Sequence, residues 1–152
     1  MAPPEPSSFS LDEQLCFALY TASRAMTGCY RPLLDQLGLT YPQYLVMLVL
    51  WERGESTVGG LGEALHLETG TLSPLLKRLE AAGLIWRRRR PDDERSVMIG
   101  LTDAGRELRR RAEAVPSTVA SATGLDAATI EELRELLQRL ADTIRADAVP
   151  VR

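Results

Sequence analysis

Residues 68–101 read ETGTLSPLLKRLEAAGLIWRRRRPDDERSVMIGL, and this stretch decides the fold. Its first half predicts a helix that opens at 69–71 and that Gly83 ends, because glycine favours the position after a last helical turn. Two extended runs, LIWRRRR and RSVMIGL, then flank the turn-forming residues 91–94, which predicts a β-hairpin. The stretch is therefore expected to be a helix followed by a two-stranded hairpin.

The residues before this stretch complete the pattern. Residues 40–43, TYPQ, form a capping box with proline in the first turn, and they open a helix that runs to Gly54. Its run YLVMLVLW is apolar nearly all round, so this helix is expected to be buried. A short extended piece at 57–58 and a glycine-weakened short helix, GGLGEAL, follow. Helix, short strand, short helix, helix and hairpin, in that order over 40–101, are the winged helix-turn-helix topology.

Each end of the chain carries an amphipathic helix. Apolar residues recur every three or four positions over 11–30, and the helix is expected to stop or kink near Pro32. In the last helix, 126–146, the spacing of apolar residues is 3, 4, 3, 4. Such seams favour pairing across a two-fold axis, although packing on the domain's own core gives the same pattern. The seam consists of Ile130, Leu133, Leu137, Leu140 and Ile144.

The fold class expected is therefore mainly α with a small β-hairpin wing, dimerising through the N- and C-terminal helices. A loose arm over 1–10 precedes a single domain over 11–152. Within that domain, 11–38 and 103–148 are the expected dimerisation helices, and 40–101 is the expected DNA-binding part.

Charge is unevenly distributed along the chain. The net charge is −3, yet residues 77–95 hold seven basic and four acidic residues. A mildly acidic protein with one concentrated basic stretch is expected to contact a polyanion there. A charged hairpin that is merely solvated is the plain alternative.

In this topology the helix that opens at residue 69 enters the major groove of double-stranded DNA. Its first residues are small or hydroxyl-bearing and make no bidentate contact to a base, so readout by groove shape is expected to supplement direct contacts. Arg95 is expected to recognise groove shape by inserting into a narrow minor groove, with its guanidinium fixed by Asp93. An ion pair internal to the hairpin is the alternative. The candidate DNA-binding residues are Thr69, Gly70, Thr71, Ser73, Pro74, Lys77, Arg78, Arg88, Asp93 and Arg95.

Several function classes are disfavoured. The first ten residues lack the pattern of a secretory signal, and no run of 18 apolar residues occurs, so a cytoplasmic protein without a membrane partner is expected. Two cysteines and one histidine, far apart in sequence, do not suggest a disulfide scaffold, a metal cluster or a histidine-based catalytic triad. No metal and no cofactor are expected, and the protein is not expected to be an enzyme.

Three segments carry a family resemblance: LDEQLCFALYTASRAMTGCYRPLLDQLGLTYPQYLVMLVLWE (11–52), ETGTLSPLLKRLEAAGLI (68–85) and DDERSVMIGLTDAG (92–105). On these the chain resembles the MarR family and, within it, the organic-hydroperoxide-resistance regulators (OhrR). The last two segments are general to the family, and the first is specific to the hydroperoxide-sensing subgroup. The resemblance covers roughly residues 11–115.

The resemblance implies a homodimeric repressor that binds an inverted-repeat operator and releases it when an organic hydroperoxide oxidises a cysteine. The position matching that cysteine is Cys16. The positions matching the tyrosines that hydrogen-bond its sulfur from the partner subunit are Tyr30 and Tyr41, and Tyr20 matches an aromatic residue one turn after the cysteine. The gene derepressed would be a peroxide-detoxifying one.

The residues themselves add a chemical argument. A thiol attacks a peroxide as its thiolate, so a sensing site must favour the anion. Tyr20 shares a helix face with Cys16, four residues earlier, although a lone cysteine is often only a small buried hydrophobe. Thirteen helical steps would hold Cys16 and Cys29 about 20 Å apart, beyond disulfide reach within one subunit. We therefore expect a low-molecular-weight thiol to form the mixed disulfide, while a Cys16–Cys29 bridge between subunits stays open.

Two other functions compete with this hypothesis. A MarR-type regulator can be released by non-covalent binding of a small aromatic ligand, which needs no cysteine. A thiol peroxidase is the enzyme alternative, but no peroxidase scaffold and no second resolving cysteine are apparent in the sequence.

Overall fold

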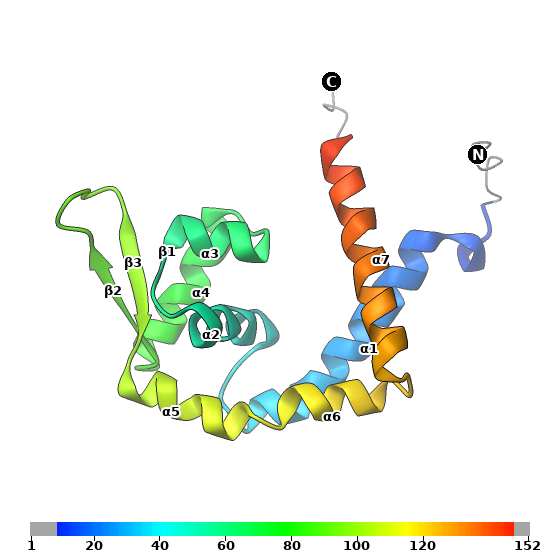
Figure 1. Ribbon diagram of the computed structural model, residues 1–152, viewed down its shortest axis with the longest axis horizontal. Helices are drawn as coiled ribbons and strands as arrows, with labels where there is room; N and C mark the ends of the chain where they lie inside the picture. The colour runs from blue at the N-terminus through cyan, green and yellow to red at the C-terminus, as the bar shows by residue number, and fades with distance from the viewer. Residues whose placement is uncertain (1–8, 148–152) are drawn as a thin grey trace. The chain divides into compact units, whose positions relative to one another are not determined.

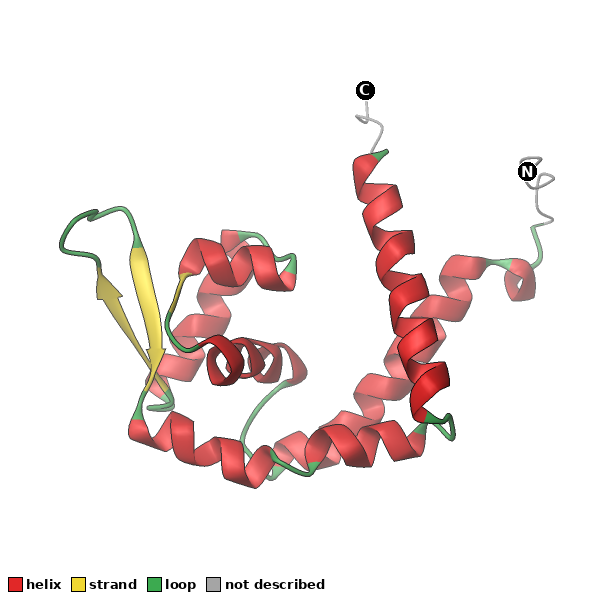
Figure 2. Ribbon diagram, in the orientation of Figure 1, coloured by secondary structure: helices red, strands yellow, loops and turns green. Residues whose placement is uncertain are grey.

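The computed structural model describes residues 9–147, which divide into two compact units at Val115–Pro116. Figures 1 and 2 show helices throughout and one small sheet, so the predicted fold class is confirmed. The elements of the described residues, in chain order, are a 3-10 turn Leu11–Glu13, α1 Leu15–Asp35, α2 Tyr41–Arg53, β1 Ser56–Thr57, α3 Val58–Leu65, α4 Thr69–Ala81, β2 Ile85–Arg89, β3 Val97–Leu101, α5 Asp103–Ala112, α6 Val115–Ala122 and α7 Ala127–Ala146.

The sheet is antiparallel, with strand order β1-β3-β2. The hairpin register pairs Ile85 with Leu101 at its root and Arg89 with Val97 toward its tip. The short β1 pairs Ser56 with Ile99, which fixes the hairpin to the start of α3. The hairpin tip projects beyond the helices of this unit as a wing (Figure 2).

Helix α2 is the centre of the first unit. The Thr40 side chain accepts from the Gln43 N–H at 3.4 Å, and the Gln43 side chain accepts from the Thr40 N–H at 3.0 Å, so the predicted capping box is confirmed. Val46, Met47 and Leu50 are almost completely buried, as the apolar run predicts. Because α2 is buried on several faces, the helices and strands that pack against it are held in fixed positions.

Helix α4 follows the predicted boundaries closely. Leu72, Leu76 and Leu79 recur at helical spacing and are buried, which leaves the opposite face exposed. The helix ends where Gly83 adopts a φ of 75°, a backbone conformation that favours glycine. The N–H of Gly83 then donates to Glu80 O, and the N–H of Leu84 donates to Leu79 O. This Schellman motif turns the chain directly into β2.

Three local predictions differ from the structure. Pro32 lies inside α1, which continues to Asp35, so the helix does not stop at the proline although proline removes one of its hydrogen bonds. The side chain of Leu34, in the last turn, is buried. The same helix begins only at Leu15, since the extended backbone of Gln14 separates it from the 3-10 turn. The short strand ends at Thr57, whose side chain accepts from the Gly60 N–H and caps α3.

The second unit contains α7. Asp126 caps the start of this helix, and its carboxylate accepts from the Thr129 N–H at 2.8 Å. No residue of α7 is buried, and Leu133, Leu136 and Ile144 are exposed. Helix α1 likewise exposes Leu15 and Met26. Among residues 9–147 no helix is long and apolar enough to span a membrane. The expected arm over 1–10 and the chain end after 147 fall mostly outside the described residues.

Candidate nucleic-acid interface and thiol site

The N-terminal turn of α4 presents its small residues to solvent. Thr69, Gly70 and Thr71 are exposed, Ser73 is half-buried and Pro74 is exposed. The first N–H groups of a helix lack partners within it and form the positive end of its dipole, which suits phosphate oxygens. One turn later Lys77 and Arg78 are also exposed, on the side away from the buried leucines.

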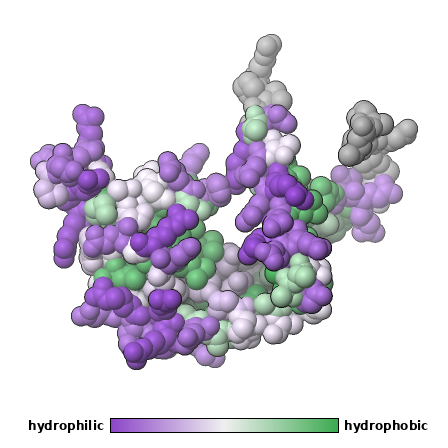
Figure 3. Space-filling model, viewed as in Figure 1, coloured by the Kyte–Doolittle hydropathy of each residue, from purple (hydrophilic) through white to green (hydrophobic). Residues whose placement is uncertain are grey.

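A groove of about 460 Å³ lies between α4, the start of α3 and the wing. It brings four of the predicted residues together, Thr69 and Ser73 from α4 with Asp93 and Arg95 from the hairpin tip. Arg87 also lines it, within 3.9 Å of Glu80, and the sequence analysis did not single it out. Hydrophilic side chains cover the wing tip (Figure 3).

The expected pairing of Asp93 with the Arg95 guanidinium is wrong. Asp93 instead accepts a hydrogen bond from the main-chain N–H of Arg95, at 3.1 Å, which holds the turn and leaves the side chain of Arg95 exposed. The side-chain pair of the tip joins Arg90 to Asp92 at 2.8 Å. Hydrogen bonds from its own main chain and from Arg90 lower the pKa of Asp92.

Arg88 has a specific neighbour on the wing. Its guanidinium lies 4.5 Å from the centre of the Trp86 ring, a cation–π arrangement. The indole in turn lies flat against Gly100, where a Cβ would overlap the ring. The contact with the Trp86 ring holds the Arg88 side chain along the strand, so packing rather than an ion pair orients the Arg88 guanidinium.

Cys16 lies in the first turn of α1 and is exposed. Tyr20, one turn later, is exposed too, and its ring lies 5.5 Å below the Arg24 guanidinium. Within the described residues no hydrogen bond reaches the Cys16 sulfur. The single chain therefore does not build a complete thiol site.

At the other end of α1 three tyrosine rings form a cluster. The ring centres of Tyr30 and Tyr41 are 4.9 Å apart, and Tyr44 lies 5.7 Å from Tyr30 and 6.5 Å from Tyr41. Burial raises the pKa of Tyr30 and of Tyr41 and raises that of Tyr44 to about 12. All three phenols are thus protonated donors near neutral pH. We call Tyr30, Tyr41 and Tyr44 the tyrosine cluster.

Tyr44 was not among the predicted site residues, although its spacing from Tyr41 is a sequence signal. Tyr41 and Tyr44 are three residues apart in one helix and therefore share a face. Of the predicted thiol-site residues, Tyr30 and Tyr41 lie together in the structure. Cys16 of the same chain lies far from both. Fourteen steps along α1 separate Cys16 from Tyr30, about 21 Å at 1.5 Å per residue.

Helix α1 also carries Cys29. The helix is unbroken from Cys16 to Cys29, so the condition for the sequence argument holds, and the thirteen steps span about 20 Å. Both cysteines are free and exposed. A disulfide between them within one chain is excluded by this separation.

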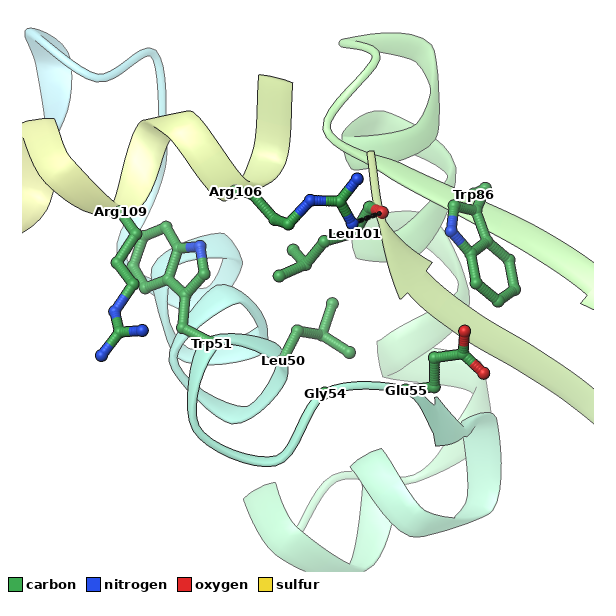
Figure 4. A pocket seen from close by; sticks show the side chains of 8 residues that line it. All are labelled: Leu50, Trp51, Gly54, Glu55, Trp86, Leu101, Arg106 and Arg109. Carbon is green, nitrogen blue, oxygen red and sulfur yellow. Dashed lines mark hydrogen bonds between the residues drawn. The ribbon is translucent and has the colours of Figure 1, made fainter. Parts of the chain in front are cut away.

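A pocket of about 380 Å³ lies where α2, α5 and the root of the wing meet. In Figure 4 Trp51 and Trp86 stand on opposite sides, with Leu50 and Leu101 between them. Arg106 donates to the Leu101 carbonyl at 3.0 Å, and the volume is within the range of small-ligand sites. Arg109 and Glu55 complete the lining.

The helical core, the exposed α4 and the hairpin define a winged helix-turn-helix regulator. The chain belongs to the SarA/Rot family of transcriptional regulators, which its residues 29–111 match, and it is a regulator of the MarR type. It is 47% identical over 134 residues to the organic hydroperoxide resistance transcriptional regulator of Bacillus subtilis, covering 88% of this chain and 91% of the relative.

Two further proteins are similar. The transcriptional regulator TtmR of Methylorubrum extorquens is 52% identical over 132 residues, 87% of this chain, but the chain spans only 66% of that relative's length. AbfR, a protein of Staphylococcus epidermidis, has been solved reduced and bound to DNA (38% identity, TM-score 0.74, covering 90% of this chain and 93% of AbfR). Its disulfide form is also similar (39% identity, TM-score 0.60, 90% of each chain). The named relatives are regulators, not enzymes.

Proposed function

We propose that this chain is a DNA-binding repressor, active as a homodimer, that releases an inverted-repeat operator when an organic hydroperoxide oxidises Cys16. The observation that carries the proposal is that α1 has an exposed thiol in its first turn and, toward its other end, Tyr30, a protonated phenol packed in the tyrosine cluster. The similarity to the Bacillus subtilis regulator supports the choice of peroxide.

The DNA contact follows from the exposed turn of α4 and the wing. Thr69, Gly70, Thr71, Ser73 and Pro74 face the major groove, while Lys77 and Arg78 contact phosphates. Arg95 enters the minor groove from the wing tip, and Arg88 contacts the backbone beside it. Asp93 acts indirectly, because its hydrogen bond to the Arg95 main chain sets the turn from which Arg95 projects.

The dimer follows from the exposed apolar residues of α1 and α7. Leu15, Met26, Leu133 and Ile144 are all solvent-exposed in the single chain, and such faces are stable when a second copy covers them. A two-fold axis also provides the donors for the thiol. Tyr30 and Tyr41 of the partner subunit hydrogen-bond the Cys16 thiolate, and Tyr20 lies over it on the same helix face.

The chemistry is a two-electron oxidation of sulfur. The Cys16 thiolate attacks the terminal oxygen of the hydroperoxide, the O–O bond breaks and an S–O bond forms. The leaving alkoxide takes a proton and departs as the alcohol, which leaves Cys16 as a sulfenic acid. A low-molecular-weight thiol then attacks this sulfur, forms the mixed disulfide and releases water.

The mixed disulfide is larger than a thiolate and accepts fewer hydrogen bonds. Tyr30 and Tyr41 lose their acceptor, and the helices around them repack. Because the dimer sets the separation of the two α4 helices, repacking moves them away from the ~34 Å that matches one turn of DNA. Binding to two half-sites at once is then lost.

The test compares matched cysteine variants in a mobility-shift assay with cumene hydroperoxide and a small thiol. The DNA is an inverted-repeat duplex selected from a random pool by the reduced wild-type protein. Wild type and Cys29→Ser release the DNA after peroxide treatment, while Cys16→Ser binds and stays bound. If Cys16→Ser is released like wild type, the sensor assignment is wrong, and if Cys29→Ser is not released, Cys29 takes part in an intersubunit bridge.

The pocket between Trp51 and Trp86 favours a second candidate, release by a small aromatic ligand. A flat ring fits between the two indoles above Leu50 and Leu101 (Figure 4), and a carboxylate on it would face Arg106. Salicylate, used as the probe with Cys16→Ser, distinguishes the two. Release of the DNA from Cys16→Ser by millimolar salicylate supports the ligand. Wild-type protein that releases the DNA with salicylate but not with peroxide rejects the thiol.

A further inference from the structure

The buried ring of Tyr44 connects the tyrosine cluster to a tryptophan. Tyr44 is only 2% exposed, and its ring lies 5.7 Å from Tyr30 on one side and 6.2 Å from Trp51 on the other. The Tyr44–Trp51 contact is edge-to-face, with 68° between the planes, a geometry that aromatic pairs prefer. Because buried rings fill their space at close packing, one ring of this row does not shift without moving the next.

The tryptophan is fastened to the element that follows the wing. Trp51 donates its indole N–H to the main-chain oxygen of Gly105, across 2.9 Å and 54 residues of sequence. Gly105 lies in the first turn of α5, where its N–H donates to the Thr102 side chain. A hydrogen bond from a half-buried indole to a main-chain oxygen fixes both position and orientation.

Gly105 in turn lies against the root of the wing. A Cβ on this residue would overlap the carbonyl oxygen of Leu84, the residue that directly precedes β2. The main-chain N–H of Thr102 donates to that same oxygen at 3.1 Å. The row Tyr30, Tyr44, Trp51 and Gly105 therefore forms continuous contacts from the end of α1 to the start of the hairpin, all within the first unit.

We propose that Tyr44 and Trp51 are positioning residues that transmit a displacement of Tyr30 to the root of the wing. The inference rests on the proposed function in one respect, namely that the tyrosine cluster is displaced on sensing and the wing contacts DNA. It adds a route that acts inside one subunit, separate from the change in spacing between the two α4 helices. Contiguity alone does not demonstrate coupling, so the test measures coupling directly.

The chain offers a matched pair of tryptophans. Trp51→Phe keeps an aromatic ring against Tyr44 but removes the N–H that reaches Gly105. Trp86→Phe makes the same chemical change on the other side of the pocket, outside the row. The displacement is introduced by Tyr30→Leu in reduced protein, so no peroxide is used.

The experiment is a double-mutant cycle on affinity for the pool-selected duplex, measured by fluorescence anisotropy with the full chain. We expect Tyr30→Leu to weaken binding about tenfold in wild type and in Trp86→Phe, a typical allosteric coupling. In Trp51→Phe the same change is expected to weaken binding less than about threefold. An equal loss in all three backgrounds, or no loss in wild type, overturns the proposal.

A second measurement covers the case in which Trp51→Phe does not fold. Hydrogen–deuterium exchange of otherwise wild-type protein carrying Tyr30→Leu is expected to rise at the amides of 103–106. Exchange in α3, at Leu61 for example, serves as the internal reference. No rise at 103–106 overturns the proposal. Since neither measurement involves Cys16, their failure is distinct from failure of peroxide sensing.

Discussion

The hydroxyl of Thr102 donates to the carbonyl oxygen of Gly83 at 2.6 Å and accepts from the N–H of Gly105 at 3.1 Å. One side chain thus joins the end of α4 to the start of α5, across the base of the wing. We expect Thr102→Ala to lower the free energy of unfolding by about 1–2 kcal/mol, the cost of removing an N-cap. Urea denaturation measures this loss.

Thr102→Ser is the matched control, because serine keeps the hydroxyl and caps helices as well as threonine does. Its unfolding free energy is expected to stay within about 0.5 kcal/mol of wild type. Equal losses in the alanine and serine variants would mean that the methyl group, not the two hydrogen bonds, stabilises this junction.

Gly105→Ala is expected to be strongly destabilising. The added Cβ would overlap the main-chain oxygen of Leu84, which a side-chain rotation cannot relieve. Overpacking of this kind costs about 1–3 kcal/mol. Gly70→Ala provides the contrast, since no atom lies within 4 Å of its Cβ position and alanine favours a helix. A lower unfolding temperature for Gly70→Ala than for Gly105→Ala would contradict the packing around Gly105.

Arg95→Ala is expected to weaken DNA binding without loss of stability, because the side chain is exposed and the hydrogen bond to Asp93 comes from the main-chain N–H, which alanine keeps. Each phosphate or minor-groove cation that is removed reduces the magnitude of the slope of log affinity against log salt by about one, so the two subunits of a dimer together reduce it by about two. Arg139→Ala, an exposed arginine of α7, is the control and leaves the slope unchanged. An unchanged slope in Arg95→Ala would remove this residue from the interface.

Alkaline pH is expected to destabilise the fold through the tyrosine cluster. Burial raises the pKa of Tyr44 from 10.0 to about 12, so the folded state favours the protonated phenol. That stabilisation is complete below pH 10 and is lost as pH rises from 10 toward 12, by about 2–3 kcal/mol in total. Tyr44→Phe, which has no ionisable group, is expected to lose less stability over this range in urea titrations. Parallel pH profiles for the two proteins would contradict the assignment.

Much of the fold was predictable because its signals are local. The capping box at Thr40 and Gln43 and the glycine after α4 act through hydrogen bonds within a few residues, so their sequence patterns suffice. At Pro32 the helix continues for three more residues, through the buried Leu34, so the local preference of proline placed the helix end too early. Local patterns predict helix ends well only where no tertiary contact competes.

In the candidate sites too, residues placed by local patterns were predicted and residues placed by tertiary contacts were not. The α4 residues were predicted from their place in the topology, and they lie where expected, on an exposed turn. The Asp93–Arg95 side-chain pair was wrong, because a tight turn brought the carboxylate to a main-chain N–H instead. The spacing of Tyr41 and Tyr44 indicates that they share a helix face, but no sequence pattern indicates that the Tyr44 ring also contacts Tyr30 of another helix and Trp51.

The length of α1 has a further consequence. With Cys16 near its start and Tyr30 about 21 Å further on, Tyr30 cannot reach the sulfur of its own chain. On the proposed mechanism, reactivity toward peroxide is a property of the pair and disappears on dissociation. A subunit diluted below the dissociation constant of the dimer would neither hold two half-sites nor respond to the oxidant. The concentration of this protein in the cell would then set its sensitivity to peroxide as well as its occupancy of DNA.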